Sequence, residues 1–184
     1  MRSTEPKNNQ NRHDAGFTLI ELISVLVLIS IISATAIPAL SRLDDSRDAA
    51  MVHECERWIR LAQATAISSS LPTGVEVDLD AQLIRMRQID PAFQATAVMD
   101  RPVTGKPMQM QLSSNFPGAG IGSAGFGPMV QSSGSTVLWF DFDGSPQSRD
   151  SDGSDPQQAS NPFVLTSSMD RTLTVLPSTG MVRR

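Results

Sequence analysis

A single apolar run near the N-terminus constrains this chain more than any other feature. Residues 17–40 read FTLIELISVLVLISIISATAIPAL and contain one charged residue, Glu21. At about 1.5 Å per residue, a helix of this length is long enough to cross the ~30 Å hydrocarbon core of a bilayer. We therefore expect a transmembrane helix over 17–40, preceded by a polar segment over 1–16.

The charges that flank the run predict its orientation. Arg2, Lys7 and Arg12 precede it, whereas the arginines that follow it, Arg42 and Arg47, stand among acidic residues. Positive charge collects on the cytoplasmic side of membrane helices, and acidic residues contribute little to that bias. The sequence therefore predicts a single-pass protein with a cytoplasmic N-terminus and a C-terminal part outside the cytoplasm.

Three interpretations of the apolar run compete. An ordinary signal peptide would be cut after Ala36, because Ala34-Thr35-Ala36 forms a small-residue cleavage site. A permanent signal anchor would not be cut at all. Neither interpretation explains Glu21, because an ionisable group inside a membrane helix costs about 3 kcal/mol and usually marks a function.

The third interpretation rests on Gly16-Phe17-Thr18-Leu19-Ile20-Glu21-Leu22. This string resembles the processing site of type IV pilins and type II secretion pseudopilins. The resemblance implies that a prepilin peptidase cuts after Gly16 and that the new N-terminal Phe17 becomes N-methylphenylalanine. Residues 1–16 are then a cleaved leader, and 17–40 stay in the mature chain as an assembly helix of the bacterial inner membrane. It also implies that Glu21 neutralises the N-terminal amine of a neighbouring subunit, and that Pro38 softens the helix.

The segment 41–70 continues the helix in amphipathic form. Residues 42–66 contain no Pro or Gly, and an apolar stripe recurs at helical spacing. We expect this helix to pack on a sheet of the same domain, and Pro38 to bend or melt it near 34–38. The expected stripe is Met51, Cys55, Trp58, Ala62 and Ala66, flanked by Val52, Ile59 and Leu61; the expected polar face is Asp48, Glu54, Glu56, Arg57, Arg60 and Gln63.

Residues 71–184 are expected to form a β-rich globular domain. Alternating or β-branched segments separated by turn residues are typical of antiparallel strands. The glycine-rich segment 115–128 and the polar segment 145–161 are expected to be surface loops. The fold class predicted is thus α+β, with a long N-terminal helix packed on an antiparallel sheet. Strands are expected over 75–79, 83–89, 108–112, 136–140, 162–167 and 172–176, with a closing hairpin to 181–182.

Three strings in the periplasmic part narrow the resemblance. Residues 56–67 (ERWIRLAQATAI), 140–144 (FDFDG) and 177–184 (PSTGMVRR) are similar to segments of the H-type minor pseudopilins of the general secretion pathway. Related minor pilins, including the fimbrial T type, share the first of these segments, 56–67. These strings are short, so they identify the subgroup less specifically than residues 16–22 identify the class.

Composition argues against an enzyme. The chain of 184 residues has one cysteine and two histidines, which leaves little for a metal cluster or a catalytic triad. No cofactor-binding loop is evident. Asp150, Asp152 and Asp155 are weak calcium candidates, because carboxylates suit that ion but their spacing is not that of an EF-hand. We interpret them as a solvated acidic loop.

The sequence therefore predicts a minor pseudopilin that takes part in protein secretion across the outer membrane. Its expected partners are other pilin or pseudopilin subunits, prepilin peptidase/N-methyltransferase, the inner membrane and a secretion substrate. The alternatives are a minor type IV pilin for pilus assembly or DNA uptake, and an anchored binding domain that never polymerises. Nucleic acid is an unlikely partner, because loss of residues 1–16 removes three basic and two acidic residues and makes the formal charge of −4 more negative.

Overall fold

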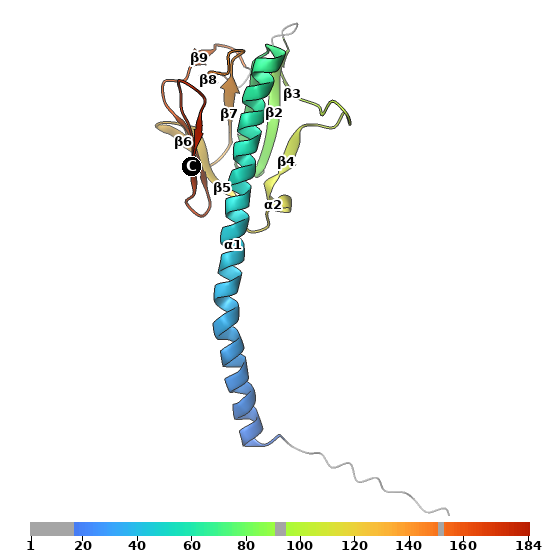
Figure 1. Cartoon of the computed structure of the whole chain (residues 1–184), viewed down its shortest axis with the longest axis vertical. Helices are drawn as coiled ribbons and strands as arrows, with labels where there is room; N and C mark the ends of the chain where they lie inside the picture. The colour runs from blue at the N-terminus through green and yellow to red at the C-terminus, as the bar shows by residue number, and fades with distance from the viewer. Residues whose placement is uncertain (1–16, 91–94, 151–152) are drawn as a thin grey trace, which may run out of the picture. The chain divides into compact units, whose positions relative to one another are not determined.

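The computed structural model describes residues 17–90, 95–150 and 153–184 (Figure 1). The chain divides into two compact units, residues 1–41 and 42–184. One long helix, α1 (Leu19–Ser69), contributes to both units. Among its described residues, the second unit holds the last part of α1, a short helix and twelve strands, so the predicted α+β class is confirmed.

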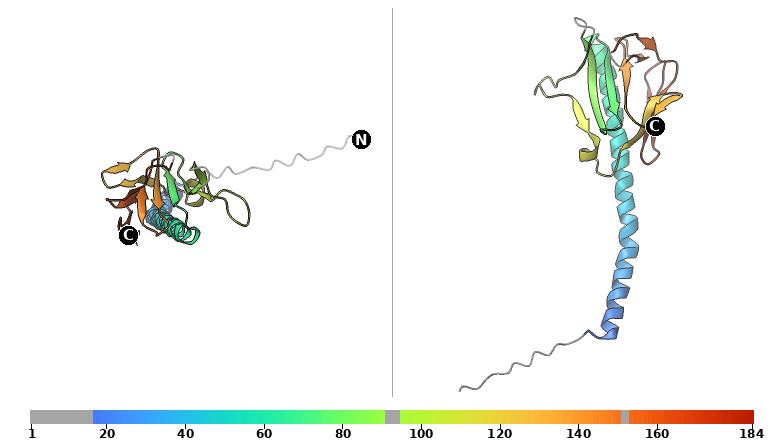
Figure 2. Two further views of the ribbon diagram at one scale, coloured as in Figure 1. Left: turned by 90° about the horizontal axis from the view of Figure 1, so that it is seen from above. Right: turned by 180° about the vertical axis from the view of Figure 1, so that it is seen from behind.

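The strands form two antiparallel sheets (Figure 2). The seven-stranded sheet has the order β3-β2-β1-β7-β8-β9, with β4 also paired to β2, and the five-stranded sheet has the order β12-β11-β10-β5-β6. The elements are β1 (Thr73–Asp78), β2 (Leu83–Asp90), β3 (Ala95–Val98), β4 (Gln109–Gln111), α2 (Leu112–Asn115), β5 (Ile121–Phe126), β6 (Met129–Gln131), β7 (Ser135–Phe140), β8 (Pro146–Ser148), β9 (Gln157–Gln158), β10 (Phe163–Ser167), β11 (Thr172–Val175) and β12 (Val182–Arg183).

The predicted apolar stripe of α1 is confirmed. Its five members are all buried, together with Val52 and Ile59, in one core cluster that also contains residues of both sheets. Leu61 differs, since 41% of it is exposed. Cys55 is a buried core residue, and burial raises the pKa of its thiol to about 12. The helix is therefore held by packing along one face.

Two segments expected to be loops contain strands. The glycine-rich segment forms β5, in which Ile121 and Ala124 are buried. Gly125, at φ +156°, faces β6 so closely that a Cβ there would lie 2.2 Å from the Met129 carbonyl oxygen. Glycine thus allows two strands to approach rather than marking a loop. Within 145–161, β8 and β9 extend the first sheet. Hydrogen bonds between backbone groups of neighbouring strands stabilise these two strands despite their polar side chains.

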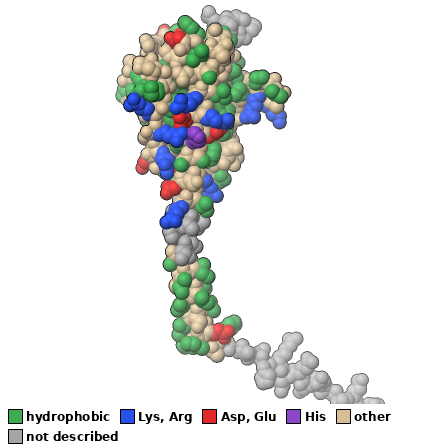
Figure 3. All heavy atoms as spheres, in the orientation of Figure 1, with side chains coloured by type: hydrophobic (Ala, Val, Ile, Leu, Met, Phe, Trp, Pro, Cys, Tyr) green, Lys and Arg blue, Asp and Glu red, His purple; other side chains and the backbone are tan. Residues whose placement is uncertain are grey.

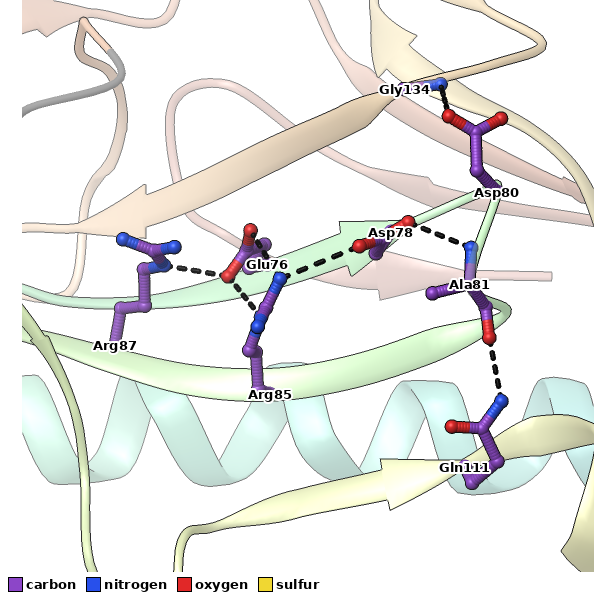
Figure 4. Close-up of polar contacts among 8 residues, drawn as sticks. All are labelled: Glu76, Asp78, Asp80, Ala81, Arg85, Arg87, Gln111 and Gly134. Atoms are coloured by element: carbon purple, nitrogen blue, oxygen red, sulfur yellow. Dashed lines mark hydrogen bonds and ion pairs between the residues drawn. The ribbon is translucent and has the colours of Figure 1, made fainter.

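The first two strands are tied together by a buried ionic network (Figure 4). Glu76, only 3% exposed, accepts hydrogen bonds from Arg85 at 3.1 Å and Arg87 at 2.6 Å. Asp78 caps the following turn by accepting a hydrogen bond from the Ala81 amide at 2.9 Å. The carboxylate of Glu76 can therefore be buried because arginines on the neighbouring strand β2 pair with it.

Candidate assembly helix

The start of α1 places Glu21 in its first turn. Thr18 precedes the helix, and its carbonyl oxygen accepts hydrogen bonds from the amides of Glu21 at 3.1 Å and Leu22 at 3.2 Å. The Thr18 hydroxyl also lies 3.4 Å from the Glu21 amide, as in a helix N-cap. A carboxylate three residues after the cap is favoured by the helix dipole. Sequence reasoning missed this role, although Thr-x-x-Glu is a recognisable capping signature.

The first turns of α1 present apolar side chains on all sides. Twelve large apolar residues between Phe17 and Ile32 are 45% to 82% exposed. The serine hydroxyls in this stretch are internally satisfied, since Ser24 donates to the Ile20 carbonyl and Ser30 to the Leu26 carbonyl, each at 2.8 Å. A helix that is apolar all round needs an apolar environment.

Within the described ranges, no helix combines the length and the apolarity that a membrane span requires. Backbone hydrogen bonding remains helical through 34–38, so the melted stretch expected there is absent. A proline can be tolerated inside a long helix when neighbouring turns keep their hydrogen bonds. The Pro38 side chain and Gly16 lie outside the described residues.

The later part of α1 is fixed to the β domain by a buried carboxylate. Asp48, expected on the polar face, is fully buried. It accepts a hydrogen bond from the Ser167 hydroxyl at 2.8 Å and pairs with Arg171 at 3.3 Å. The expectation of an exposed Asp48 was wrong, because β10 and the turn after it cover this side of the helix. A buried carboxylate persists when it is paired and hydrogen-bonded.

A second carboxylate joins α1 to the end of the chain. Glu56 pairs with Arg60 at 2.9 Å and accepts a hydrogen bond from Arg184 at 2.6 Å. Arg184 also contacts His53, and Figure 3 shows Lys and Arg side chains gathered around that histidine. Burial acts to raise the pKa of Glu56, but the two guanidinium groups outweigh it and lower the pKa.

This pairing predicts an acid-sensitive attachment of the chain end. Because the folded-state pKa of Glu56 lies below its ordinary value of 4.5, the pair stabilises the fold above that value. Stability is lost as pH falls through the folded pKa. We expect Glu56→Gln to reduce this part of the acid dependence, which thermal unfolding at a series of pH values would measure. If Glu56→Gln and Asp150→Asn reduced the acid dependence equally, the prediction would be contradicted, since Asp150 is an exposed acid.

The side-chain amide of Gln63 connects the C-terminal part of α1 to two turns of the β domain. The Gln63 side chain donates to the Gly144 carbonyl at 2.9 Å and to the Thr179 carbonyl at 3.2 Å. These two turns belong to strings 140–144 and 177–184, which carry the subgroup resemblance. Gly144 has φ +83°, and a Cβ there would lie 2.9 Å from the Ile67 side chain. The turn therefore requires glycine for both its conformation and its contact with α1.

The calcium candidates are only partly described by the structure. Asp150 and Asp155 are exposed, and Asp152 lies outside the described residues. Within the described ranges, no group of three His, Cys, Asp or Glu residues is placed to hold a metal ion.

Comparison with known proteins found similarity to the N-terminal motif and to the fold of the chain. Residues 11–37 match the family model of the prokaryotic N-terminal methylation motif. Among curated proteins, no sequence matches the chain. One structure of the minor pseudopilin EpsH from the Type 2 Secretion System of Vibrio cholerae is 14% identical, with 74% of this chain and 94% of that chain covered and a TM-score of 0.53. A second EpsH structure from the same organism is 16% identical, with coverage of 76% and 93% and a TM-score of 0.50.

These findings confirm the predicted resemblance at both the motif and the fold. The two comparison proteins are named as minor pseudopilins. The chain thus carries the prokaryotic N-terminal methylation motif over residues 11–37, and its fold is similar to that of the minor pseudopilin EpsH.

Proposed function

We propose that this chain is a minor pseudopilin, a structural subunit of a type II secretion pseudopilus that serves protein secretion across the outer membrane. Its precursor is anchored in the inner membrane by α1, with the N-terminus cytoplasmic and the β domain periplasmic. Prepilin peptidase cuts after Gly16 and methylates Phe17. The mature helix then leaves the lipid and packs among the helices of neighbouring subunits.

The exposed apolar start of α1, with Glu21 as its charged residue, carries this proposal. The β domain already buries its own core, so the exposed part of the helix is not needed for that fold. A carboxylate in lipid is costly alone and much less so beside an ammonium group. The N-terminal amine of a neighbouring subunit, freed by processing at Gly16, supplies that partner. Assembly thereby satisfies a charge that the separate subunit leaves exposed.

The mass of the mature protein, purified from membranes of its own host, tests the processing step. We expect a chain that begins at Phe17 and is one methyl group heavier than its sequence. A Gly16→Leu variant, expressed in the same way, should keep residues 1–16. A chain that begins at Ile37 would instead show signal-peptide cleavage, and an intact Met1 in a host with active prepilin peptidase would show a plain anchor.

A further inference from the structure

A cavity lined by residues of both sheets combines buried charged side chains with an apolar wall. It has a volume of about 270 Å³. Pockets for drug-sized ligands usually measure roughly 300–1,000 Å³, so this cavity suits a smaller ligand. The side chains that matter for its chemistry are Glu76, Arg87 and Val137 of the first sheet, Phe126 and Met129 of the second sheet, and Arg149, which follows β8.

The first sheet contributes the face that points away from α1. Glu76 and Val137 are directly opposite each other in the register of β1 and β7, so their side chains lie on one face. Val75 and Val77, the neighbours of Glu76 in β1, belong to the core cluster that contains the α1 stripe. Because side chains alternate along a strand, Glu76 points to the opposite side. The cavity is therefore separate from the packing of α1 on the sheet.

The carboxylate of Glu76 is already matched by two guanidinium groups. Arg85 and Arg87 both donate hydrogen bonds to it (Figure 4), and Arg85 also pairs with Asp78 at 3.4 Å. Arg87 uses Nε for Glu76 and Nη1 for the Thr96 hydroxyl at 3.1 Å. Its Nη2 makes no hydrogen bond to the part of the chain that the structure describes. The cavity is therefore closed to a cation at Glu76 but offers a donor at Arg87.

Arg149 is a buried cation whose hydrogen-bond acceptors are neutral. Its side chain is only 9% exposed, and the carboxylate of Asp141 lies 4.0 Å away, too far for a hydrogen bond. Its Nε and Nη2 donate to the Gln147 side-chain oxygen at 3.0 and 2.7 Å, and its Nη1 donates to the Gly153 carbonyl at 3.1 Å. Burial lowers the pKa of Arg149, and Asp141 opposes that shift only in part. An anion in the cavity would compensate this charge.

The second sheet contributes the apolar wall. Phe126 and Met129 are directly opposite each other in the register of β5 and β6. The Phe126 ring packs edge-on against the buried Phe163 ring, with 5.2 Å between centroids, which fixes its position. Met129 is 74% exposed on β6, the last strand of its sheet. Because methionine is flexible, it can adapt to an apolar ligand. A ligand in the cavity therefore contacts arginines of one layer and apolar side chains of the other.

We propose that this cavity binds the carboxylate of a small apolar acid, with the carboxylate beside Arg87 and Arg149 and the apolar body against Phe126 and Met129. Guanidinium groups bind carboxylates through two parallel hydrogen bonds. A doubly charged phosphate fits less well, because Glu76 and the exposed Asp150 also line the cavity and would repel it. The same chemistry has two sources, a free carboxylic acid and the C-terminal residue of a peptide. The site goes beyond the proposed function, because no residue of α1 lines the cavity.

Calorimetric titration of the full-length protein in detergent micelles tests the site. The probes are 4-methylpentanoate for a free acid, N-acetyl-leucine for the C-terminal residue of a peptide, and N-acetyl-leucinamide as the neutral control. We expect saturable binding of an acid at least about tenfold tighter than binding of the amide or of inorganic phosphate. Tighter binding of N-acetyl-leucine than of 4-methylpentanoate would identify a peptide C-terminus as the source, and the reverse order would identify a free acid.

A matched pair of variants at one exposed position isolates the effect of charge. Because Met129 is 74% exposed, Met129→Glu and Met129→Lys should both fold, and both lose the same apolar contact. We expect the acid to bind at least about tenfold more weakly to Met129→Glu than to Met129→Lys. Arg149→Gln should weaken binding by a similar factor. Arg183→Gln, which changes an exposed arginine outside the cavity, should leave the affinity unchanged.

Three results would overturn the proposal. Equal affinity for N-acetyl-leucine and its amide would show that the carboxylate is not recognised. Equal affinity of the two Met129 variants for the acid would place the binding outside the cavity, and this comparison holds even if Arg149→Gln fails to fold. Absence of saturable binding by protein of the correct mature mass would also overturn it, while leaving the proposed processing at Gly16 intact.

Discussion

Replacing Glu21 with Gln is expected to remove the protein from filaments while leaving its β domain folded. The substitution keeps the side-chain length but removes the charge that pairs with a neighbour's N-terminal amine. Breaking a buried ion pair costs roughly 3–5 kcal/mol, which corresponds to more than about a hundredfold in an association equilibrium. The fraction of subunit recovered in sheared filaments, relative to the amount in membranes, measures the effect.

The capping contact of Thr18 provides the control for this experiment. Thr18→Ala removes the hydroxyl that lies 3.4 Å from the Glu21 amide but leaves the carboxylate in place. Loss of a helix cap costs about 1 kcal/mol, so assembly should fall far less than with Glu21→Gln. If the two variants reduced assembly equally, Glu21 would be acting through the start of the helix and not through a neighbouring subunit.

The features that the sequence predicted well are those with strong local signals. The stripe from Met51 to Ala66 follows helical spacing and is buried as expected. The strand around Trp139 is β-branched and aromatic, and it forms β7 near the middle of the first sheet. In both cases the hydrophobic periodicity and the intrinsic propensity of the residues favour the same secondary structure, and tertiary packing favours it too.

The features that sequence reasoning missed depend on partners far away in the chain. Whether Gly125 lies in a loop or a strand is decided by β6 and β10, which pair on either side of β5. Asp48 looks like a surface residue until Ser167, 119 residues later, supplies a hydrogen bond. Burial that arises from long-range pairing leaves no trace in local periodicity, so neither outcome could have been predicted.

A pocket lined by Ala49, Val52, Arg171, Thr172 and Arg184 shows the same division. Its floor lies next to the predicted stripe, but its rims come from the turn before β11 and from the end of the chain. Local signals in 41–70 therefore predict only the helix face, whereas the arginines beside the pocket are placed by the strand edge that covers that face. Candidate sites built from two distant segments require the fold before they can be recognised.

Replacing Arg171 with Gln is expected to destabilise the β domain more than replacing its partner, Asp48, with Asn. Asp48 is fully buried, whereas the Arg171 side chain is 47% exposed. Losing the arginine leaves the buried carboxylate with one hydroxyl as its hydrogen-bond donor, which lowers the free energy of unfolding by roughly 2–4 kcal/mol. Losing the carboxylate leaves an arginine that water can solvate, at a cost of about 1 kcal/mol.

The double variant decides between this explanation and simple loss of contact. If the unpaired buried charge is the main cost, then Asp48→Asn in combination with Arg171→Gln should be more stable than Arg171→Gln alone. Denaturant unfolding of the full chain in detergent micelles measures the order, and Arg47→Gln serves as a control because its pair with Asp44 is exposed. If the free-energy costs of the two substitutions add in the double variant, the two side chains contribute through independent packing contacts. If the unpaired charge is the main cost, the second substitution removes the penalty that the first created, and the costs do not add.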